Sequence, residues 1–261
     1  MEVFIVDAFA EKIFSGNPAA VCRLDKWPAD ALMQQIAAEN NLAETAFVVN
    51  EQDGYRIRWF TPAVEVDLCG HATLASAHVL FNHLNYAGNE LSFNSRSGKL
   101  TVTKNNEGLT LNFPVDQITE VDVTDEMRSC FASTPVAAYK GKTDYMFVFD
   151  KQEQIENISP DLDAIGKFDA RGIIVTAPGK EVDFVSRFFA PQSGIDEDPV
   201  TGSAHTSLTP YWSAKLGKTS LSATQLSQRK GKLQCELKGD RVLISGKAIT
   251  YLIGNIQSKN F

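Results

Sequence analysis

The chain carries three short motifs twice, in the same order. Each copy has an arginine followed by two aromatic residues, then a glycine that opens a small-residue segment, then an arginine just before Gly-Lys-Leu. The pairs are Arg58 with Arg187, Gly70 with Gly202, and Arg96 with Arg229. Their separations of 129, 132 and 133 residues are nearly constant, which indicates duplication of one structural unit. We therefore expect two similar halves.

An acidic, polar stretch from Asp116 to Glu126 lies between the two sets of motifs. It leads us to expect a first half at residues 1–116 and a second at 117–247. The apolar segment at 248–253 has no counterpart and is expected to be an extra strand. Val3–Asp7 and Met146–Asp150 resemble each other, so we expect equivalent strands there.

Within each half, short β-branched or aromatic runs predict strands, and a few longer runs predict helices. The expected strands are 3–6, 45–49, 55–60, 100–103 and 109–113; the expected helices are 28–40, 72–81 and 203–215. The helix at 72–81 is rich in Ala and Leu, which is typical of a helix buried on all sides. Its counterpart contains Pro210, which is expected to end or kink it. This pattern predicts an α+β fold in which strands surround a central helix, twice over.

Composition excludes several functions. The net charge of −7 argues against a nucleic-acid partner or an anionic membrane. The four cysteines are scattered, and the four histidines show no metal-ligand spacing, so neither disulfides nor a metal is expected. No nucleotide-binding motif is present, and no cofactor is expected. With neither a leader nor an apolar run of membrane-spanning length, we expect a cytoplasmic protein.

Gly70 and Gly202 each precede a predicted helix at equivalent places in the two halves. A helix start presents free N–H groups and a partial positive charge, and glycine allows a ligand to approach closely. Simple capping without a ligand is the alternative for either helix alone. The repetition favours a carboxylate-binding role, with a substrate held between the two halves.

Glu44 lies between the predicted helix at 28–40 and an apolar strand. Neighbours such as Ala46 and Phe47 are expected to desolvate its carboxylate partly, which suits it to proton transfer. A solvated glutamate at a strand edge is the alternative.

Three further residues flank the helix starts, and each permits more than one interpretation. Asp198 either handles a proton or caps the helix. His71 shuttles a proton, hydrogen-bonds a substrate or is a core histidine. Cys69 is either a reactive thiol at a helix start or a small buried side chain.

The motifs together resemble the phenazine-biosynthesis (PhzF-like) family. The matching blocks run from near the N-terminus to about residue 233. They are Gly16–Val21, Glu44–Val48, Leu68–Leu74, Phe93–Gly98, Glu197–Ala204 and Gln225–Arg229.

The resemblance implies a diaminopimelate epimerase-like fold, with two pseudo-symmetric halves that are each a rolled β-sheet or barrel around a central helix. It implies that the last strand, about 248–261, returns to the first half. Members of the family are often homodimers, so the resemblance also makes a homodimer an expectation. It further implies a cofactor-independent isomerase or epimerase that moves a proton on a small carboxylate or amino-acid-like substrate. The implied catalytic residues are Glu44, Asp198 and His71; the implied substrate-binding residues are Gly70, Gly202, Ser203, Cys69 and Thr201.

The sequence departs from the epimerase relatives in one respect. Those enzymes use one cysteine from each half, whereas here Cys69 is matched by Thr201. A one-carboxylate mechanism is therefore expected, with reprotonation by Glu44 itself or by a neighbour such as Asp198. Two other functions stay open: a catalytically silent binding protein of the same fold, and a thiol enzyme that uses Cys69 with His71.

Overall fold

The computed structural model describes residues 1–52, 54–106 and 108–257, and it divides into two units. Unit 1 comprises Met1–Asn112 together with Ser245–Phe261, and unit 2 comprises Phe113–Ile244. The divisions fall inside strands β8 (Gly108–Pro114) and β16 (Arg241–Gly246). From the sequence we expected one half at 1–116 with 248–261 and another at 117–247. These domain boundaries stay a prediction.

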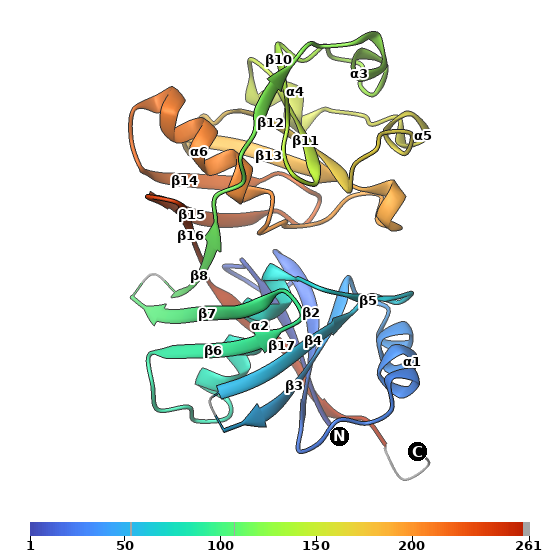
Figure 1. Ribbon diagram of the computed structural model, residues 1–261, viewed down its shortest axis with the longest axis vertical. Helices are drawn as coiled ribbons and strands as arrows, with labels where there is room; N and C mark the ends of the chain where they lie inside the picture. Colours follow the sequence, from blue (N-terminus) through green and yellow to red (C-terminus); the bar gives the residue numbers. More distant parts are fainter. Residues whose placement is uncertain (53, 107, 258–261) are drawn as a thin grey trace. The chain divides into compact units, whose positions relative to one another are not determined.

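Unit 1 is built from strands that fold around one helix (Figure 1). Strand β2 pairs antiparallel with β1 and parallel with β3; β3 pairs antiparallel with β4, and β4 pairs parallel with β6. Antiparallel hairpins then join β6 to β7 and β7 to β8. The elements of this unit are β1 (Glu2–Ala8), β2 (Asn17–Leu24), α1 (Asp30–Asn40), β3 (Glu44–Glu51), β4 (Gly54–Phe60), β5 (Glu65–Val66), α2 (Gly70–Asn82), β6 (Glu90–Ser95), β7 (Gly98–Asn105) and β17 (Ala248–Asn255).

Helix α2 is the centre of unit 1. Nearly every one of its residues is buried, and it contacts β1, β2, β3, β7 and β17. Small residues such as Ala72, Ala75 and Ala77 let these strands approach the helix closely. The prediction of a helix buried on all sides is confirmed. The helix extends slightly beyond the predicted range of 72–81 at both ends.

The last strand, β17, pairs antiparallel with β1 and so completes unit 1. Two histidines also contact β17 at Thr250 Oγ1. His78 Nε2, from α2, lies 3.0 Å away, and His83 Nε2, from the C-cap of α2, lies 2.7 Å away. The chain's first and last strands are therefore neighbours, and both are fastened to the central helix.

Unit 2 repeats the same arrangement around α6 (His205–Leu216), which contacts β14 and β15. A separate aromatic cluster, which includes Phe131, Phe147 and Phe189, fills the space under its short helices. The remaining elements are β9 (Thr119–Val121), α3 (Asp125–Ser129), β10 (Ala137–Lys140), β11 (Asp144–Val148), α4 (Gln152–Glu156), α5 (Leu162–Ile165), β12 (Gly172–Pro178), β13 (Phe184–Phe189), the 3₁₀ turn η1 (Pro191–Ser193), β14 (Ser220–Gln225) and β15 (Gly231–Lys238).

The strand pairings confirm the predicted pseudo-symmetric halves. In unit 2, β10–β11 is antiparallel, β11–β12 parallel, β12–β13 antiparallel, β13–β14 parallel and β14–β15 antiparallel, as for the corresponding strands of unit 1. The repeated arginines also match in detail. Arg58 donates two hydrogen bonds to Glu65, both at 2.7 Å, and Arg187 donates two to Glu197, at 2.6 and 2.9 Å.

Two details of the prediction were wrong. Strand β11 corresponds to β2 rather than β1, so Met146–Asp150 is not the equivalent of Val3–Asp7. Helix α6 begins at His205 instead of Ser203, because tight turns first connect Gly202 O to the His205 amide and Ser203 O to the next amide.

Pro210 lies inside α6 without ending it. Proline has no N–H, so the carbonyl of Thr206 loses its usual helical partner. The amide of Asp116 donates to that carbonyl instead, at 3.2 Å. An outside donor thus explains how the helix continues past the proline.

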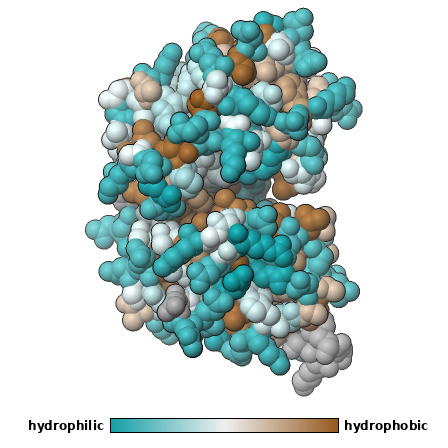
Figure 2. Space-filling model, in the orientation of Figure 1, coloured by the Kyte–Doolittle hydropathy of each residue, from teal (hydrophilic) through white to brown (hydrophobic). Residues whose placement is uncertain are grey.

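The face of the molecule in Figure 2 is mainly hydrophilic, with separate brown patches of apolar residues. Large apolar side chains that are exposed in unit 1 include Phe14 and Ile253. Among the described residues, no helix combines the length and apolar character needed to cross a membrane.

Candidate active site

Glu44 is the first residue of β3, directly after the turn that ends α1. Asn41 terminates that helix in the left-handed conformation, at φ 48°, which asparagine tolerates better than most residues. The side chain of Asn40 then donates to Thr45 Oγ1 at 3.1 Å, which fixes the strand's first residues. As a result, the Glu44 side chain is held with only 13% of its surface exposed.

Cys69 and His71 flank the first residue of α2. Cys69 is the N-cap in an extended conformation, and its carbonyl accepts hydrogen bonds from both the amide and the hydroxyl of Thr73. Both the Cys69 and the His71 side chains are buried. The helix start that the sequence predicted at Gly70 is therefore present, and it carries two chemically active side chains.

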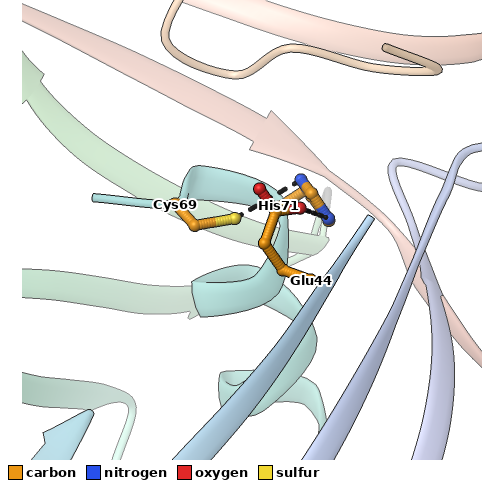
Figure 3. Close-up of side chains that lie close together, drawn as sticks. All are labelled: Glu44, Cys69 and His71. Carbon is orange, nitrogen blue, oxygen red and sulfur yellow. Dashed lines mark hydrogen bonds and ion pairs between the residues drawn. The ribbon is translucent and has the colours of Figure 1, made fainter. Parts of the chain in front are cut away.

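The structure brings Glu44, Cys69 and His71 together (Figure 3). His71 Nε2 lies 3.2 Å from Glu44 Oε2, and Cys69 Sγ lies 3.6 Å from His71 Nδ1. One donor or acceptor atom from each of the three side chains lies within 4.8 Å of the others. A carboxylate, an imidazole and a thiol in this arrangement are able to transfer a proton or to hold a metal ion.

The environment raises the pKa of two of these groups, which leaves one neutral and the other charged. Burial raises the pKa of the Cys69 thiol to about 11, and the Glu44 carboxylate adds to that rise, so Cys69 is a neutral thiol at neutral pH. Burial by itself lowers the pKa of His71, but its acidic neighbours Cys69 and Glu44 outweigh burial and raise that pKa well above its ordinary value. His71 is therefore a cationic imidazole whose Nε2 faces the Glu44 carboxylate.

Asn17 is a site residue that the sequence analysis did not single out, although it lies in the Gly16–Val21 block. Its side-chain nitrogen lies 3.1 Å from His71 Nδ1, in a fully buried position. Gly16 makes this possible: its φ is 68°, and an added Cβ would lie 2.1 Å from the Ala8 carbonyl oxygen. An amide that presents either its nitrogen or its oxygen suits both protonation states of the imidazole.

In unit 2, Asp198 and Thr201 are linked through Gln225. Thr201 donates its hydroxyl to Asp198 Oδ2 at 2.5 Å and its amide to Gln225 Oε1 at 2.8 Å. Gln225 Nε2 in turn donates to the Asp198 carbonyl at 2.8 Å. Gly202, next in the chain, is buried. The segment before α6 is thus held in one conformation by a buried glutamine, another residue without an assigned role in the sequence analysis.

Ser203 accepts a hydrogen bond from Arg171 Nη1 at 2.9 Å. The guanidinium of Arg171 donates two hydrogen bonds to the carboxylate of Asp144, which is almost fully buried. Arg171 was not predicted, and nothing in its local sequence distinguishes it from a surface arginine. Because the hydroxyl oxygen of Ser203 accepts a hydrogen bond from Arg171, the hydroxyl hydrogen is available for another acceptor.

The predicted site residues therefore form one group in each unit. Unit 1 holds Glu44, Cys69, Gly70 and His71; unit 2 holds Asp198, Thr201, Gly202 and Ser203. Their catalytic and substrate-binding roles stay predictions.

Solved structures share this fold along nearly the whole chain. A phenazine biosynthesis protein of the PhzF family from Enterococcus faecalis is 50% identical, with a TM-score of 0.95 and 97% of each chain covered. A probable proline racemase from Agrobacterium radiobacter, at 8% identity and a TM-score of 0.64, shares the fold alone, over 100% of this chain and 94% of its own. The predicted epimerase-like fold class is confirmed.

A sequence relationship then defines the family. The model of the phenazine biosynthesis-like family (PhzC-PhzF) matches residues 6–254. An uncharacterized isomerase of Pseudomonas aeruginosa is 53% identical over 258 residues, which is 98% of each chain. The chain belongs to the phenazine biosynthesis-like family, and its enzyme class is that of an isomerase.

Proposed function

We propose that the protein is a cofactor-independent isomerase or epimerase that moves a proton on a small carboxylate or amino-acid-like substrate. Glu44 is its acid and base. The observation that carries this proposal is the buried contact of 3.2 Å between Glu44 Oε2 and His71 Nε2 at the start of α2. A carboxylate with little solvent and a basic partner is equipped to take a proton from carbon and return it.

The substrate's own carboxylate makes the removed proton more acidic when donors stabilise the enolate that develops. In the proposal, the first amides of α2, beginning at Gly70, supply such donors in unit 1. Ser203 supplies another in unit 2, since Arg171 donates to its hydroxyl oxygen and leaves the hydroxyl hydrogen to be donated to substrate.

The proton's return has two routes. Glu44 returns it to a different carbon or to the other face, or Asp198 delivers a second proton. Asp198 receives the Thr201 hydroxyl and is thereby oriented. In the proposal, His71 keeps the Glu44 side chain in position and balances its charge.

A thiol enzyme is the second candidate function, because Cys69 Sγ lies 3.6 Å from His71 Nδ1. A thiol acts as a base or nucleophile in its thiolate form, however. The pKa of Cys69, which burial raises to about 11, disfavours that form at neutral pH. We therefore assign the proton transfer to Glu44.

The test is proton NMR in deuterated water with a panel of amino and hydroxy acids. Enzyme-dependent loss of one carbon-bound proton signal supports the proposal and identifies the reacting atom. Ligand-induced stabilisation of the protein without any exchange would instead indicate the catalytically silent binding protein.

A further inference from the structure

Arg171 lies just before β12 and contacts the segment that leads into the central helix of unit 2. Its Nη1 donates to Ser203 Oγ at 2.9 Å, and Ser203 is only half-buried. The Arg171 side chain keeps 38% of its surface exposed, whereas that of Asp144 keeps 4%. A cation therefore contacts this hydroxyl at a place that small solutes are able to reach.

The guanidinium of Arg171 is restrained by two neighbours. Its Nε donates to Asp144 Oδ1 at 2.9 Å, and its Nη2 donates to the other oxygen of that carboxylate. The Phe188 ring also faces it, with 5.1 Å between the guanidinium carbon and the ring centroid. Gly172 leaves room for this ring, because a Cβ there would lie 2.4 Å from Phe188 Cζ. These contacts fix the direction in which Nη1 donates to Ser203.

The backbone of Ser203 is also fixed, so rotation of the hydroxyl is the freedom that Arg171 removes. The Ser203 carbonyl accepts hydrogen bonds from the Thr206 amide at 3.1 Å and from the Thr206 hydroxyl at 2.6 Å. A hydroxyl oxygen that accepts a bond from a cation turns its hydrogen away from that cation and becomes a stronger donor. The Ser203 hydrogen is thereby directed at an acceptor such as a carboxylate oxygen.

The equivalent place in unit 1 carries the opposite charge. Glu44, at the start of β3, lies 3.2 Å from His71, the residue that follows the glycine at the helix start. In unit 2, Arg171 contacts the residue at the same place, Ser203. The strand register puts Arg171 one position before the counterpart of Glu44. Each unit thus directs one charged side chain to the same position, an acid in unit 1 and a cation in unit 2.

We propose that Arg171 is a positioning residue, which directs the Ser203 hydroxyl to a carboxylate oxygen of the substrate. This inference rests on the proposed function. Burial by itself lowers the pKa of Arg171, but hydrogen bonding and charge from Asp144 outweigh burial and raise it, with smaller contributions from Asp198 and Asp116. The guanidinium is therefore charged at neutral pH. An ion pair with a structural role alone, joining β12 to β11, is the alternative.

The test removes both charges of the ion pair, because an unpaired Asp144 carboxylate would destabilise the protein. Arg171→Gln with Asp144→Asn is expected to weaken the binding of benzoate about tenfold, as measured by titration calorimetry. Benzamide has the same shape without the charge, and its binding is expected to change by less than about threefold. The matched control is Lys180→Gln with Glu153→Gln, which removes an exposed ion pair of the same unit and is expected to change neither affinity.

A second variant retains the charge beside Asp144. Arg171→Lys keeps a cation but loses the planar fork that reaches Asp144 and Ser203 together. It is expected to weaken benzoate binding about threefold. Unchanged benzoate affinity in both Arg171 variants would overturn the proposal.

A double-mutant cycle with Ser203→Ala separates positioning from a structural role. If Arg171 acts through the hydroxyl, the paired Arg171 and Asp144 change weakens benzoate binding by less than about twofold in the Ser203→Ala background. A structural role predicts the same weakening in both backgrounds, and that result would refute positioning. The absence of measurable benzoate binding by the natural protein would do so too.

Benzoate binding does not depend on turnover, so the two proposals fail separately. In a protein that exchanges a substrate proton, the paired change is expected to raise KM about tenfold and to leave kcat within about threefold. Proton exchange without coupling between Arg171 and Ser203 would refute the positioning role alone. Coupled benzoate binding in a protein that exchanges no proton would retain the binding role of these residues and refute the isomerase mechanism.

Discussion

The two units share one pattern of strand pairing but differ in the chemistry at the start of the central helix. In unit 1 the helix start carries a thiol and an imidazole, and a carboxylate faces them from β3. In unit 2 the matching positions hold Thr201 and Ser203. The register of β12 places Gly172 where unit 1 has Glu44, since Val175 faces Arg187 as Phe47 faces Arg58. The duplicated scaffold was retained while its functional groups diverged.

The buried histidines near the starts of the two central helices also differ in pKa. His71, in the first turn of α2, has a pKa raised well above its ordinary value because acidic neighbours outweigh its burial. His205, at the start of α6, has a pKa that burial lowers to about 4, and only the Thr201 carbonyl opposes that shift. Unit 1 thus builds a charged group into its core, and unit 2 buries a neutral one.

The largest expected effect comes from Glu44→Gln. The amide cannot accept a proton, so turnover is expected to fall by about 10²–10⁴-fold while substrate affinity changes little. Deuterium exchange by NMR and ligand-induced thermal shifts measure the two quantities. Glu51→Gln, at the exposed end of the same strand, is the matched control and should retain activity. Full activity in Glu44→Gln would exclude Glu44 as the base.

The second prediction concerns stability in acid. His205 stays neutral in the folded protein until about pH 4, whereas in the unfolded chain it gains a proton below about pH 6.5. Stability is therefore expected to fall as the pH drops from about 6.5 to about 4, by about 3 kcal/mol from this group. Urea unfolding at a series of pH values measures it.

His205→Leu tests the source of that acid sensitivity. The variant lacks a titrating ring, so its stability is expected to change less steeply between pH 6.5 and 4. Part of the slope should remain, because burial also lowers the pKa of His78 to about 4. An unchanged slope would show that His205 does not carry the difference between the units.

A smaller effect is expected for Ser203→Ala. Loss of one hydrogen bond to a charged substrate group should raise KM about tenfold and leave kcat within about threefold. Steady-state kinetics separate the two constants, with Ser129→Ala as the exposed control in the same unit. A fall in kcat comparable to that of Glu44→Gln would place unit 2 in the proton-transfer step.

The smallest effect is expected for Cys69→Ala. The side chain is a neutral, buried thiol, so its removal should lower turnover only about twofold to threefold. The same exchange assay measures this, and slow alkylation of the natural protein by iodoacetamide is the accompanying expectation. If Cys69→Ala were as inactive as Glu44→Gln, the base would be the thiol.

The repeat made most of the fold predictable from the sequence. Three matched motifs indicated two equivalent halves, and the apolar composition of residues 72–81 indicated a helix surrounded by strands. The equivalence of Val3–Asp7 with Met146–Asp150 was wrong because similar apolar strands recur in any sheet. Strand identity depends on pairing partners, which local composition does not encode.

The site was predictable where a motif marked it and unpredictable where long-range contacts form it. Glu44 and His71 lie in recognisable blocks, and the structure brings them together. Arg171 reaches Ser203 across 32 positions of sequence, and Gln225 reaches Thr201 across 24. Asn17 lies in a marked block, but its contact with His71 spans 54 positions. Such pairings depend on the completed fold.

The return of β17 to unit 1 fixes an order of events during protein synthesis. Unit 2 is one continuous segment, so all of its strands are synthesised before β17. Unit 1 must wait for that strand to cover β1 and to reach His78 and His83. Folding on the ribosome is therefore expected to finish in the half that is synthesised first.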